Sequence, residues 1–412
     1  MTAEVAILNT HGIALATDSA VTVLVGNEKK VYNTANKLFM LSKYHPVGIM
    51  VYNKADYMGI DWEIIIKEYR KSIKKPSDKL SDYAKNFINY VKEYTFITEE
   101  RQKDALLSIC VPIILGVRKM FFREIENKSY PNGKVTLKQS SQILDSVIKN
   151  ILEFQIKNTS KANYTFDTAF LKRYKNDIYK IIDSIFEKHK TSDKQKESIL
   201  KIIISDFSKA YELENYSGIV IAGYGDKEIF PSIYQCEICG KIGKSFVLFN
   251  ERNKSISSTK DAFIAPFAQR EMVYTFMQGI DPDLKNIIDK QLEKIMISIS
   301  DIIGNSHKDK LMYVKKEFMR YLYELQGITY TNPIMDIVQS LQKTDLAEMA
   351  ETLVNLTAFK RHVSKDAETV GGPTDVAVIT KGDGFVWIKR KQYFDIKFNP
   401  FFQKNYFMED VK

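Results

Sequence analysis

The sequence has few cysteines and no residue pattern typical of a metal site. It has three cysteines, Cys110, Cys236 and Cys239. This low and odd number argues against a disulfide framework and fits a reducing compartment. Cys236 and Cys239 form a lone CxxC motif, whereas zinc usually needs a second pair or two suitably spaced histidines. A position in a strand or turn is the favoured reading of this motif. We therefore expect neither a metal ion nor another cofactor.

A long hydrophobic segment and a secretion signal are also lacking. The longest apolar run, residues 106–117, is too short to cross a bilayer and contains Pro112. The first residues include no basic stretch followed by a long apolar one. We expect a cytoplasmic protein that does not associate with a membrane.

Acidic residues are outnumbered by basic ones, which gives a formal net charge of +9. Such a charge permits an acidic partner, including nucleic acid. However, the lysines alternate with acids along helical stretches such as 67–75 and 192–201, as on solvated helix faces. Since no nucleic-acid-binding motif accompanies them, the sequence favours solvated faces over a nucleic-acid partner.

Two kinds of apolar pattern occur along the chain. Apolar residues recur at helical spacing in 55–214, 282–326 and 345–361, where Asp345 and Glu348 resemble a capping box. Short apolar runs between turn residues predict strands. The predicted strands are 4–10, 13–19, 37–41, 47–52, 217–225, 230–238, 244–249, 374–381 and 384–391, with a polar turn at 26–30.

Strand-rich pieces therefore lie at the start, middle and end of the chain, with helical pieces between them. This order favours one layered α+β core with helical insertions over separate domains in a row. The predicted division is a core of 1–100, 215–281 and 331–392, helical insertions at 101–214 and 282–330, and a C-terminal tail at 393–412.

Thr2 is a candidate nucleophile because it directly follows Met1 and its small side chain permits methionine removal. A chain that starts with threonine carries a hydroxyl nucleophile and, in its own α-amine, a base with a pKa of about 7.7–8.0. Such a pair needs a nearby cation to ease deprotonation, and the cation needs an anionic partner.

The segment TAEVAILNTHGIALATDSAVT (2–22) resembles the opening hairpin of the proteasome β-subunit family, within the N-terminal nucleophile (Ntn) hydrolases. NTANKLFML (33–41), VGIMVYNKAD (47–56), SGIVIAGYG (217–225) and KDAETVGGPTDVAVITKGDG (365–384) are similar to later segments of that family in the same order. The resemblance covers about 1–100, 216–280 and 340–392. It implies a four-layer αββα sandwich and a threonine-type hydrolase.

The resemblance also implies roles for individual residues. Thr2 would attack a peptide carbonyl while its α-amine accepts the proton. The Lys37 ammonium would favour the alkoxide, and Asp18 would pair with it. Asp366 and, more loosely, Thr369 match residues that orient the amine. The plainer alternatives are that Thr2 is an ordinary strand residue, that Asp18 caps a turn, and that Lys37 extends from a strand end.

Further residues are matched to the substrate cleft. Backbone N–H groups at Tyr52 and Asn53 would form the oxyanion hole. The family usually has glycine at the position of Tyr52, and a tyrosine side chain that crowds the cleft would favour an inactive protein. Met50 and Phe39 would line an apolar specificity pocket, unless they are plain core residues. The stretch FIAPFAQR (263–270) lacks the serine that contacts the amine in the family, and Gln269 is a possible substitute.

Three functions remain open from the sequence. The first is a peptidase that works in a proteasome-like homo-oligomer, with a nucleotide-driven unfoldase as partner by analogy. The second is an inactive member of the family that serves as a structural or regulatory subunit. The third is a small-molecule amidase on the same fold. We expect the helical insertions to cap the cleft or to make subunit contacts.

Overall fold

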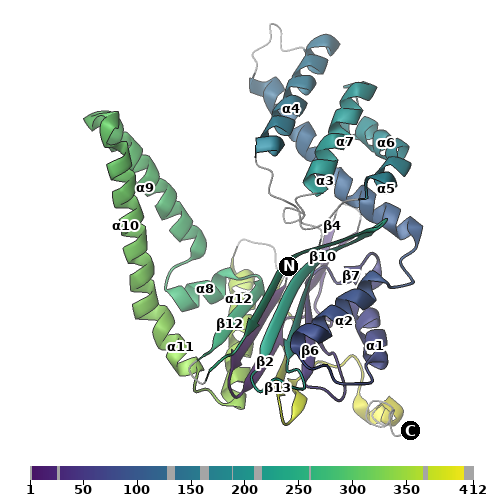
Figure 1. Cartoon of the computed structure of the whole chain (residues 1–412), viewed down its shortest axis with the longest axis vertical. Helices are drawn as coiled ribbons and strands as arrows, with labels where there is room; N and C mark the ends of the chain where they lie inside the picture. The colour runs from purple at the N-terminus through teal and green to yellow at the C-terminus, as the bar shows by residue number, and fades with distance from the viewer. Residues whose placement is uncertain are drawn as a thin grey trace.

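The computed structural model describes residues 2–25, 28–127, 135–157, 167–187, 189–207, 216–258, 261–364 and 370–402. Two antiparallel five-stranded sheets form the centre of this described part, and helices surround them, so that the fold class is α+β (Figure 1). The first sheet has the order β12 (Phe263–Ala268), β1 (Ala3–Asn9), β2 (Gly12–Thr17), β13 (Asp375–Thr380) and β14 (Gly384–Lys389). The second sheet has the order β11 (Ser245–Ser255), β10 (Ser232–Ile242), β9 (Ser217–Gly223), β6 (Val47–Asn53) and β5 (Leu38–Met40).

The two sheets face each other across an apolar core. Side chains of β1, β2, β13 and β12 in the first sheet meet those of β6, β9 and β10 in the second. All residues of β1 and β2 are buried, because helices also cover the outer face of the first sheet. This double burial explains why both segments read as nearly continuous apolar runs instead of alternating ones.

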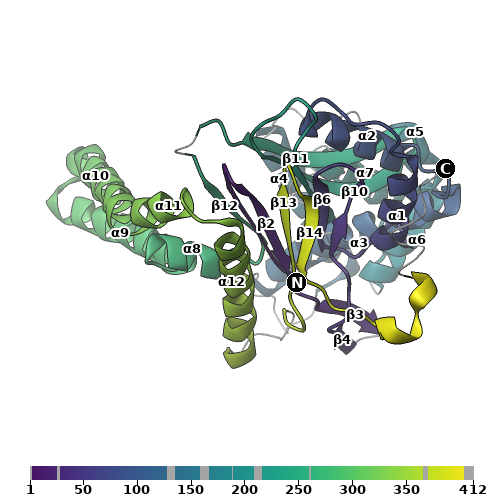
Figure 2. The ribbon, with the colours of Figure 1, turned by 90° about the horizontal axis from the view of Figure 1, so that it is seen from below.

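Each sheet has a helical cover on its outer face (Figure 2). Helix α12 (Lys343–Val363) packs on β1, β2 and β13 of the first sheet, together with α8 (Glu271–Gln278). Helices α1 (Trp62–Ser72) and α2 (Leu80–Lys92) pack on the second sheet. Helix α1 begins at Asp61, whose carboxylate accepts a hydrogen bond from the Glu63 N–H at 2.7 Å.

Two short hairpins depart from the expected strands. The predicted polar turn at 26–30 lies partly within β4 (Glu28–Tyr32), which pairs with β3 (Val21–Val25). A second hairpin joins β7 (Asp56–Tyr57) and β8 (Ile60–Asp61). Strands β10 and β11 also continue beyond the predicted ends at 238 and 249, because they pair with each other through a bulged, polar extension.

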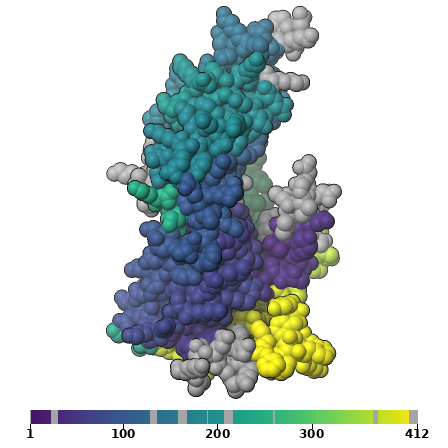
Figure 3. Space-filling view, turned by 90° about the vertical axis from the view of Figure 1, so that its right-hand side faces the viewer, coloured from purple at the N-terminus to yellow at the C-terminus, as the bar shows by residue number. Residues whose placement is uncertain are grey.

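The first helical block forms a separate mass at one end of the molecule (Figure 3). It has an apolar core of its own. Helices α3 (Glu99–Asn127), α4 (Leu137–Lys157), α6 (Lys175–Phe186) and α7 (Asp193–Phe207) supply most of this core, and the short α5 (Thr168–Arg173) adds to it. Ile242 at the end of β10 is part of the same core and ties the block to the second sheet.

Within the described residues, one helix, α3, is long and apolar enough to cross a membrane, judged by length and composition alone. A core helix of a soluble bundle meets the same criterion, and the buried residues of α3, such as Leu106 and Phe121, belong to the apolar core of the block. Pro112 lies inside this helix, which continues past it. Packing in this core accounts for the apolar residues on the buried face of α3.

The second helical region includes a long hairpin that projects from the sheets (Figure 1). Its two helices, α9 (Pro282–Ile303) and α10 (Lys308–Gln326), pack on each other, and we call them the α9–α10 arm. A π-helical turn (Gly327–Thr331) and α11 (Asn332–Val338) return the chain to the body. The arm leaves large apolar side chains exposed, among them Tyr313, Phe318 and Tyr321.

Candidate active site

A buried ion pair joins the two sheets at one end of the sandwich. Asp18 directly follows β2 in the first sheet, and Lys37 directly precedes β5 in the second. Lys37 Nζ donates to Asp18 Oδ1 at 2.6 Å, and both side chains are almost completely buried, with exposed fractions of 6% and 1%. The carboxylate and the ammonium are thus fixed by opposite layers of the fold.

The Asp18 carboxylate has further donors on the backbone. Oδ1 also accepts from the Ala3 N–H at 3.0 Å, and Oδ2 accepts from the N–H groups of Ala20 and Gly371, each at 3.1 Å. Buried carboxylates are tolerated when such donors satisfy their oxygens. Asp18 is therefore held in one orientation, with Oδ1 turned toward Lys37.

Thr2 lies at the start of β1, beside this pair. Its carbonyl oxygen accepts from the Gln269 N–H at 3.0 Å. The next residue, Ala3, accepts from the Asp18 N–H through its carbonyl and donates its own N–H to the Asp18 carboxylate. Thr2 is buried, and it lines the same cavity as Lys37. The structure therefore brings Thr2, Lys37 and Asp18 together, as the resemblance implies.

The cavity that Thr2 and Lys37 share, the Thr2 cavity, has a volume of about 270 Å³. Its lining residues are Thr2, Ala20, Val21, Thr22, Asn36, Lys37, Val51, Asn53, Lys54, Ala55 and Trp62. The charged side chains in this lining are two cations, Lys37, which is paired with Asp18, and Lys54. Such a lining favours an anionic intermediate or an anionic group of a ligand.

Tyr52 and Asn53 occupy different surroundings. The Tyr52 ring is buried between the sheets, where it stacks on Phe267, and its hydroxyl donates to Glu237 at 3.0 Å. It therefore does not crowd the cleft. Gly218 lies opposite, where a Cβ would overlap the Tyr52 ring.

Asn53, unlike Tyr52, lines the Thr2 cavity. The Val51 N–H donates to the Lys37 carbonyl at 2.9 Å, on the β5 side of β6. Because N–H directions alternate along a strand, the Asn53 N–H points toward that same edge, whereas the Tyr52 N–H points toward β9. Of the two expected oxyanion donors, the geometry favours Asn53.

The expected pocket residues Met50 and Phe39 require a correction, because neither lines the Thr2 cavity. Met50 is buried between the two sheets, and Phe39 is buried between the second sheet and its helices. Val51 and Trp62 are among the apolar residues that line it instead. The strand alternation between Met50 and Val51 is the sequence signal that distinguishes the two positions.

Asp366 and Thr369 lie outside the described residues. The glycine segment that follows them is described, and it reaches the site because Gly371 donates its N–H to Asp18. At Gly372, with a φ of 76°, a Cβ would lie 2.8 Å from the Asn33 backbone oxygen, so glycine is needed at this close approach.

Gln269, the possible substitute for the missing serine, contacts Thr2 through its backbone. Its side-chain oxygen accepts a hydrogen bond from Arg361, which also pairs with Glu271 at 2.6 Å. The Gln269 side chain is thus oriented by Arg361, while its N–H fixes the carbonyl of Thr2.

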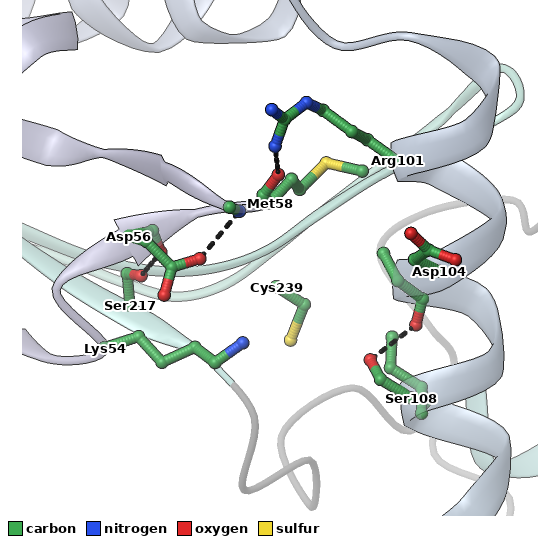
Figure 4. A pocket seen from close by; sticks show the side chains of 11 residues that line it. Lys54, Asp56, Met58, Arg101, Asp104, Ser108, Ser217 and Cys239 are labelled. Atoms are coloured by element: carbon green, nitrogen blue, oxygen red, sulfur yellow. Dashed lines mark hydrogen bonds between the residues drawn. The ribbon is translucent and has the colours of Figure 1, made fainter. Parts of the chain in front are cut away.

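A second cavity, the α3 cavity, lies between helix α3 and the end of β6, with a volume of about 250 Å³ (Figure 4). Lys54 borders both cavities and extends its amine toward Cys239. Arg101 on α3 donates to the Met58 carbonyl at 2.9 Å and closes one side. Sequence reasoning missed Lys54, whose position four residues after Met50 carries no distinct signal.

Cys239 lines this second cavity, where burial raises the pKa of its thiol to about 12. It is therefore a protonated thiol at neutral pH and a poor nucleophile or metal ligand. Within the described ranges, no group of three or more histidine, cysteine and acidic side chains lies close enough to hold a metal ion.

Comparison with known proteins gives similarity at the level of structure and not of sequence. No protein-family model matches the sequence, and no curated protein matches it. Among solved structures, the chain is similar to an Anbu (Gly-1) mutant from Hyphomicrobium sp. strain MC1, with a TM-score of 0.29 and 8% sequence identity. The match covers 100% of this chain and 98% of that chain. A similarity of this size carries no conclusion about activity.

Proposed function

We propose that the chain is an N-terminal-threonine hydrolase, a proteasome-like peptidase whose two sheets and outer helices form the four-layer αββα sandwich of the Ntn hydrolases. The observation that carries this proposal is the buried Lys37–Asp18 pair beside Thr2, which lines one cavity together with Lys37. A cation fixed by a carboxylate next to a threonine at the chain start is the arrangement that such chemistry needs.

The proposed reaction is acyl transfer through Thr2 after removal of Met1. The hydroxyl oxygen attacks the peptide carbonyl, its proton passes to the α-amine, and the carbonyl oxygen becomes an oxyanion near the Asn53 N–H. The C–N bond then breaks, and the amine product leaves with the proton. Water hydrolyses the resulting ester, which releases the acid product and restores the threonine hydroxyl.

Lys37 and Asp18 act on the charge that develops in this reaction. The Lys37 ammonium stabilises the alkoxide character of the Thr2 oxygen, and Asp18 keeps the ammonium in place. Because both are buried, their electrostatic effect is screened less by solvent than at a surface. This gives a fixed positive charge without the cost of reorganisation during the reaction.

An electrophile that reacts with both the hydroxyl and the amine of an N-terminal threonine tests the proposal directly. Intact-mass measurement should show loss of Met1 and one covalent adduct per chain. A chain that keeps Met1 and forms no adduct would exclude the mechanism, because a blocked α-amine cannot act as the base.

The alternative of an inactive structural subunit has one specific support. The stretch 263–270 lacks a serine, and the Gln269 side-chain oxygen accepts a hydrogen bond from Arg361. The other argument for inactivity, crowding by Tyr52, loses its support because the ring is buried between the sheets. A small-molecule amidase would be identified by hydrolysis of simple amides without hydrolysis of peptides.

The helical block that starts with α3 is proposed to extend the substrate cleft. The α3 cavity and the Thr2 cavity meet at Lys54. Filling the α3 cavity with Ala105→Trp should raise KM for long peptides about tenfold, equivalent to about 1.4 kcal/mol of binding, while KM for short peptides stays unchanged. Steady-state kinetics with peptides of increasing length measure this difference.

A matched control for that variant is Leu115→Trp, since Leu115 is an exposed residue of α3 outside the cavity. It should leave KM unchanged for peptides of every length. Equal effects of Ala105→Trp on short and long peptides would contradict the proposed extension of the cleft.

The chain is further proposed to form a cytoplasmic homo-oligomer, with an unfoldase as partner by analogy. The exposed apolar residues of the α9–α10 arm support a contact with a second copy. Phe318→Lys combined with Tyr321→Lys should reduce the mass measured by light scattering toward the 47.6 kDa of one chain. Tyr393→Lys, which changes an exposed residue outside the arm, is the control. An unchanged mass in the arm variant would exclude the arm as the contact.

A further inference from the structure

Glu4 is a buried acidic residue that the proposed reaction does not use. It lies in β1 with an exposed fraction of 0%, and neither of its carboxyl oxygens has a hydrogen-bond partner within the described residues. Thr17, which faces it across the β1–β2 ladder, is equally buried, and its hydroxyl also lacks a partner there. Native proteins contain few such groups, and each needs an explanation.

The position of Glu4 relates it to the Thr2 site. Side chains two positions apart point to the same face of a strand. Glu4 therefore follows Thr2 on the inner face of β1, in line with Ala6 and Leu8 of the core between the sheets. Glu4 also lies within electrostatic reach of Lys37 and Asp18. It is therefore a third charged or chargeable group directly behind the pair that supports Thr2.

The protonation state of Glu4 follows from these surroundings. An ionised carboxylate without donors is costly to bury, whereas a neutral carboxylic acid costs much less. Burial raises the pKa of Glu4 well above its ordinary value, Lys37 opposes this shift, and Asp18 adds to it. Asp18, in contrast, has four donors and already neutralises Lys37.

Other titratable groups face the same part of the inner surface. Asp375 on β13 pairs across the ladder with Thr17 and is bound by Lys391. On the opposite sheet, Tyr52 stacks on Phe267, the β12 partner of Glu4. The Tyr52 hydroxyl donates to Glu237. Asp375 and Glu237 thus have donors of their own, which leaves Lys37 as the cation that a Glu4 carboxylate would affect.

We propose that Glu4 is a positioning residue of the Thr2 site, neutral while the site is active, whose ionisation places a second negative charge beside Lys37 and slows the reaction. The effect on catalysis rests on the proposed hydrolase function. An added negative charge raises the pKa of the Thr2 α-amine, so that less of it is free to act as base, and it disfavours the developing oxyanion. Activity should therefore fall at alkaline pH as Glu4 loses its proton.

The proton on Glu4 is measurable without any turnover. Nuclear magnetic resonance of protein labelled with ¹³C in glutamate and lysine side chains, assigned with Glu4→Gln and Lys37→Met, reports both groups. At pH 7 the Glu4 carboxyl carbon should have the shift of a neutral acid. The Lys37 resonance should move when Glu4 ionises, and this change in the Lys37 resonance should be absent in Glu4→Gln. The control Thr17→Val removes the facing hydroxyl without changing charge, and it should still show the change in the Lys37 resonance.

Stability provides a second measurement with a defined sign. The folded state keeps the Glu4 proton above the ordinary glutamate pKa of about 4.3, whereas the unfolded state releases it. The folding equilibrium constant of the wild type should thus fall relative to Glu4→Gln as pH rises above this value, by about tenfold per pH unit, up to the pKa in the folded protein. Urea unfolding between pH 5 and pH 8 measures the difference.

The outcomes separate this proposal from the proposed function. A Glu4 carboxyl that is ionised at pH 7 overturns the proposal, as does a wild-type profile of kcat/KM against pH that matches that of Glu4→Gln on the alkaline side. The expected result is an alkaline loss in the wild type and in Thr17→Val that Glu4→Gln lacks. If the wild type hydrolyses no peptide, the hydrolase proposal fails, and the Lys37 resonance alone decides whether Glu4 controls the charge beside it.

Discussion

Replacing Thr2 with alanine should abolish peptide hydrolysis while the protein remains folded. The variant loses the only proposed nucleophile but keeps the α-amine, the Lys37–Asp18 pair and the backbone hydrogen bonds of Thr2 and Ala3. Loss of a nucleophile that acts as a unit with its base reduces kcat by several orders of magnitude, on the order of 10⁴ or more. The measurement is steady-state turnover of a peptide panel, with circular dichroism and the urea midpoint as checks on folding.

Thr2→Ser is the matched variant for this prediction, because it keeps the hydroxyl and the α-amine and removes a methyl group. It should retain measurable turnover, whereas Thr2→Ala should not. If Thr2→Ala keeps wild-type turnover, the nucleophile lies elsewhere. If the folded wild type is itself without activity on peptides and amides, the structural-subunit alternative gains support.

Replacing Asp18 with alanine should destabilise the protein by more than any other single change at the site. The substitution leaves the Lys37 ammonium buried without a partner and removes the acceptor of three backbone N–H groups. Removal of one partner of a buried pair costs about 3–5 kcal/mol. Lys37→Met should cost less, because Asp18 then keeps its backbone donors. Urea unfolding of both variants measures the order.

The exposed pair Lys343–Asp383 is a suitable control, since both of its side chains are more than half exposed. Solvent and salt screen such pairs, so Asp383→Asn should leave the urea midpoint nearly unchanged. If Asp18→Ala has as small an effect as Asp383→Asn, the Lys37–Asp18 pair is not a structural link between the two sheets. The role of Asp18 would then be limited to chemistry.

Apolar runs predict the strands beside the site, and Thr2 is a candidate because it follows Met1. The roles of Asp18 and Lys37 come from the resemblance to the proteasome β-subunit family, which matches both residues at the ends of such runs. Their assembly at one end of two facing sheets follows from the antiparallel β1–β2 hairpin and the short β5–β6 connection. The resemblance added the order of these segments, which local patterns do not provide.

The sequence says less about the direction in which side chains point and about contacts between residues far apart in the chain. Met50 and Phe39 are expected at the pocket because the resemblance matches them to the substrate cleft, but the face of a strand decides which residue lines a cavity. Lys54 and Glu4 gave no signal, because their roles depend on strands and helices far away in the sequence. The β3–β4 hairpin is absent from the expected strands because β4 begins with the polar residues 28–30, which are typical of a turn, although β3 is mostly apolar.

The shape of the molecule has a consequence for its behaviour in solution. A compact chain of 412 residues should have a radius of gyration of about 22 Å. The helical block on α3–α7 and the α9–α10 arm both extend away from the sheets (Figure 1), so friction in solution should exceed that of a sphere of equal mass. A single chain would then elute early in gel filtration, in the position of a larger assembly. The number of chains in an assembly should therefore be measured by light scattering or sedimentation equilibrium, which depend on mass and not on shape.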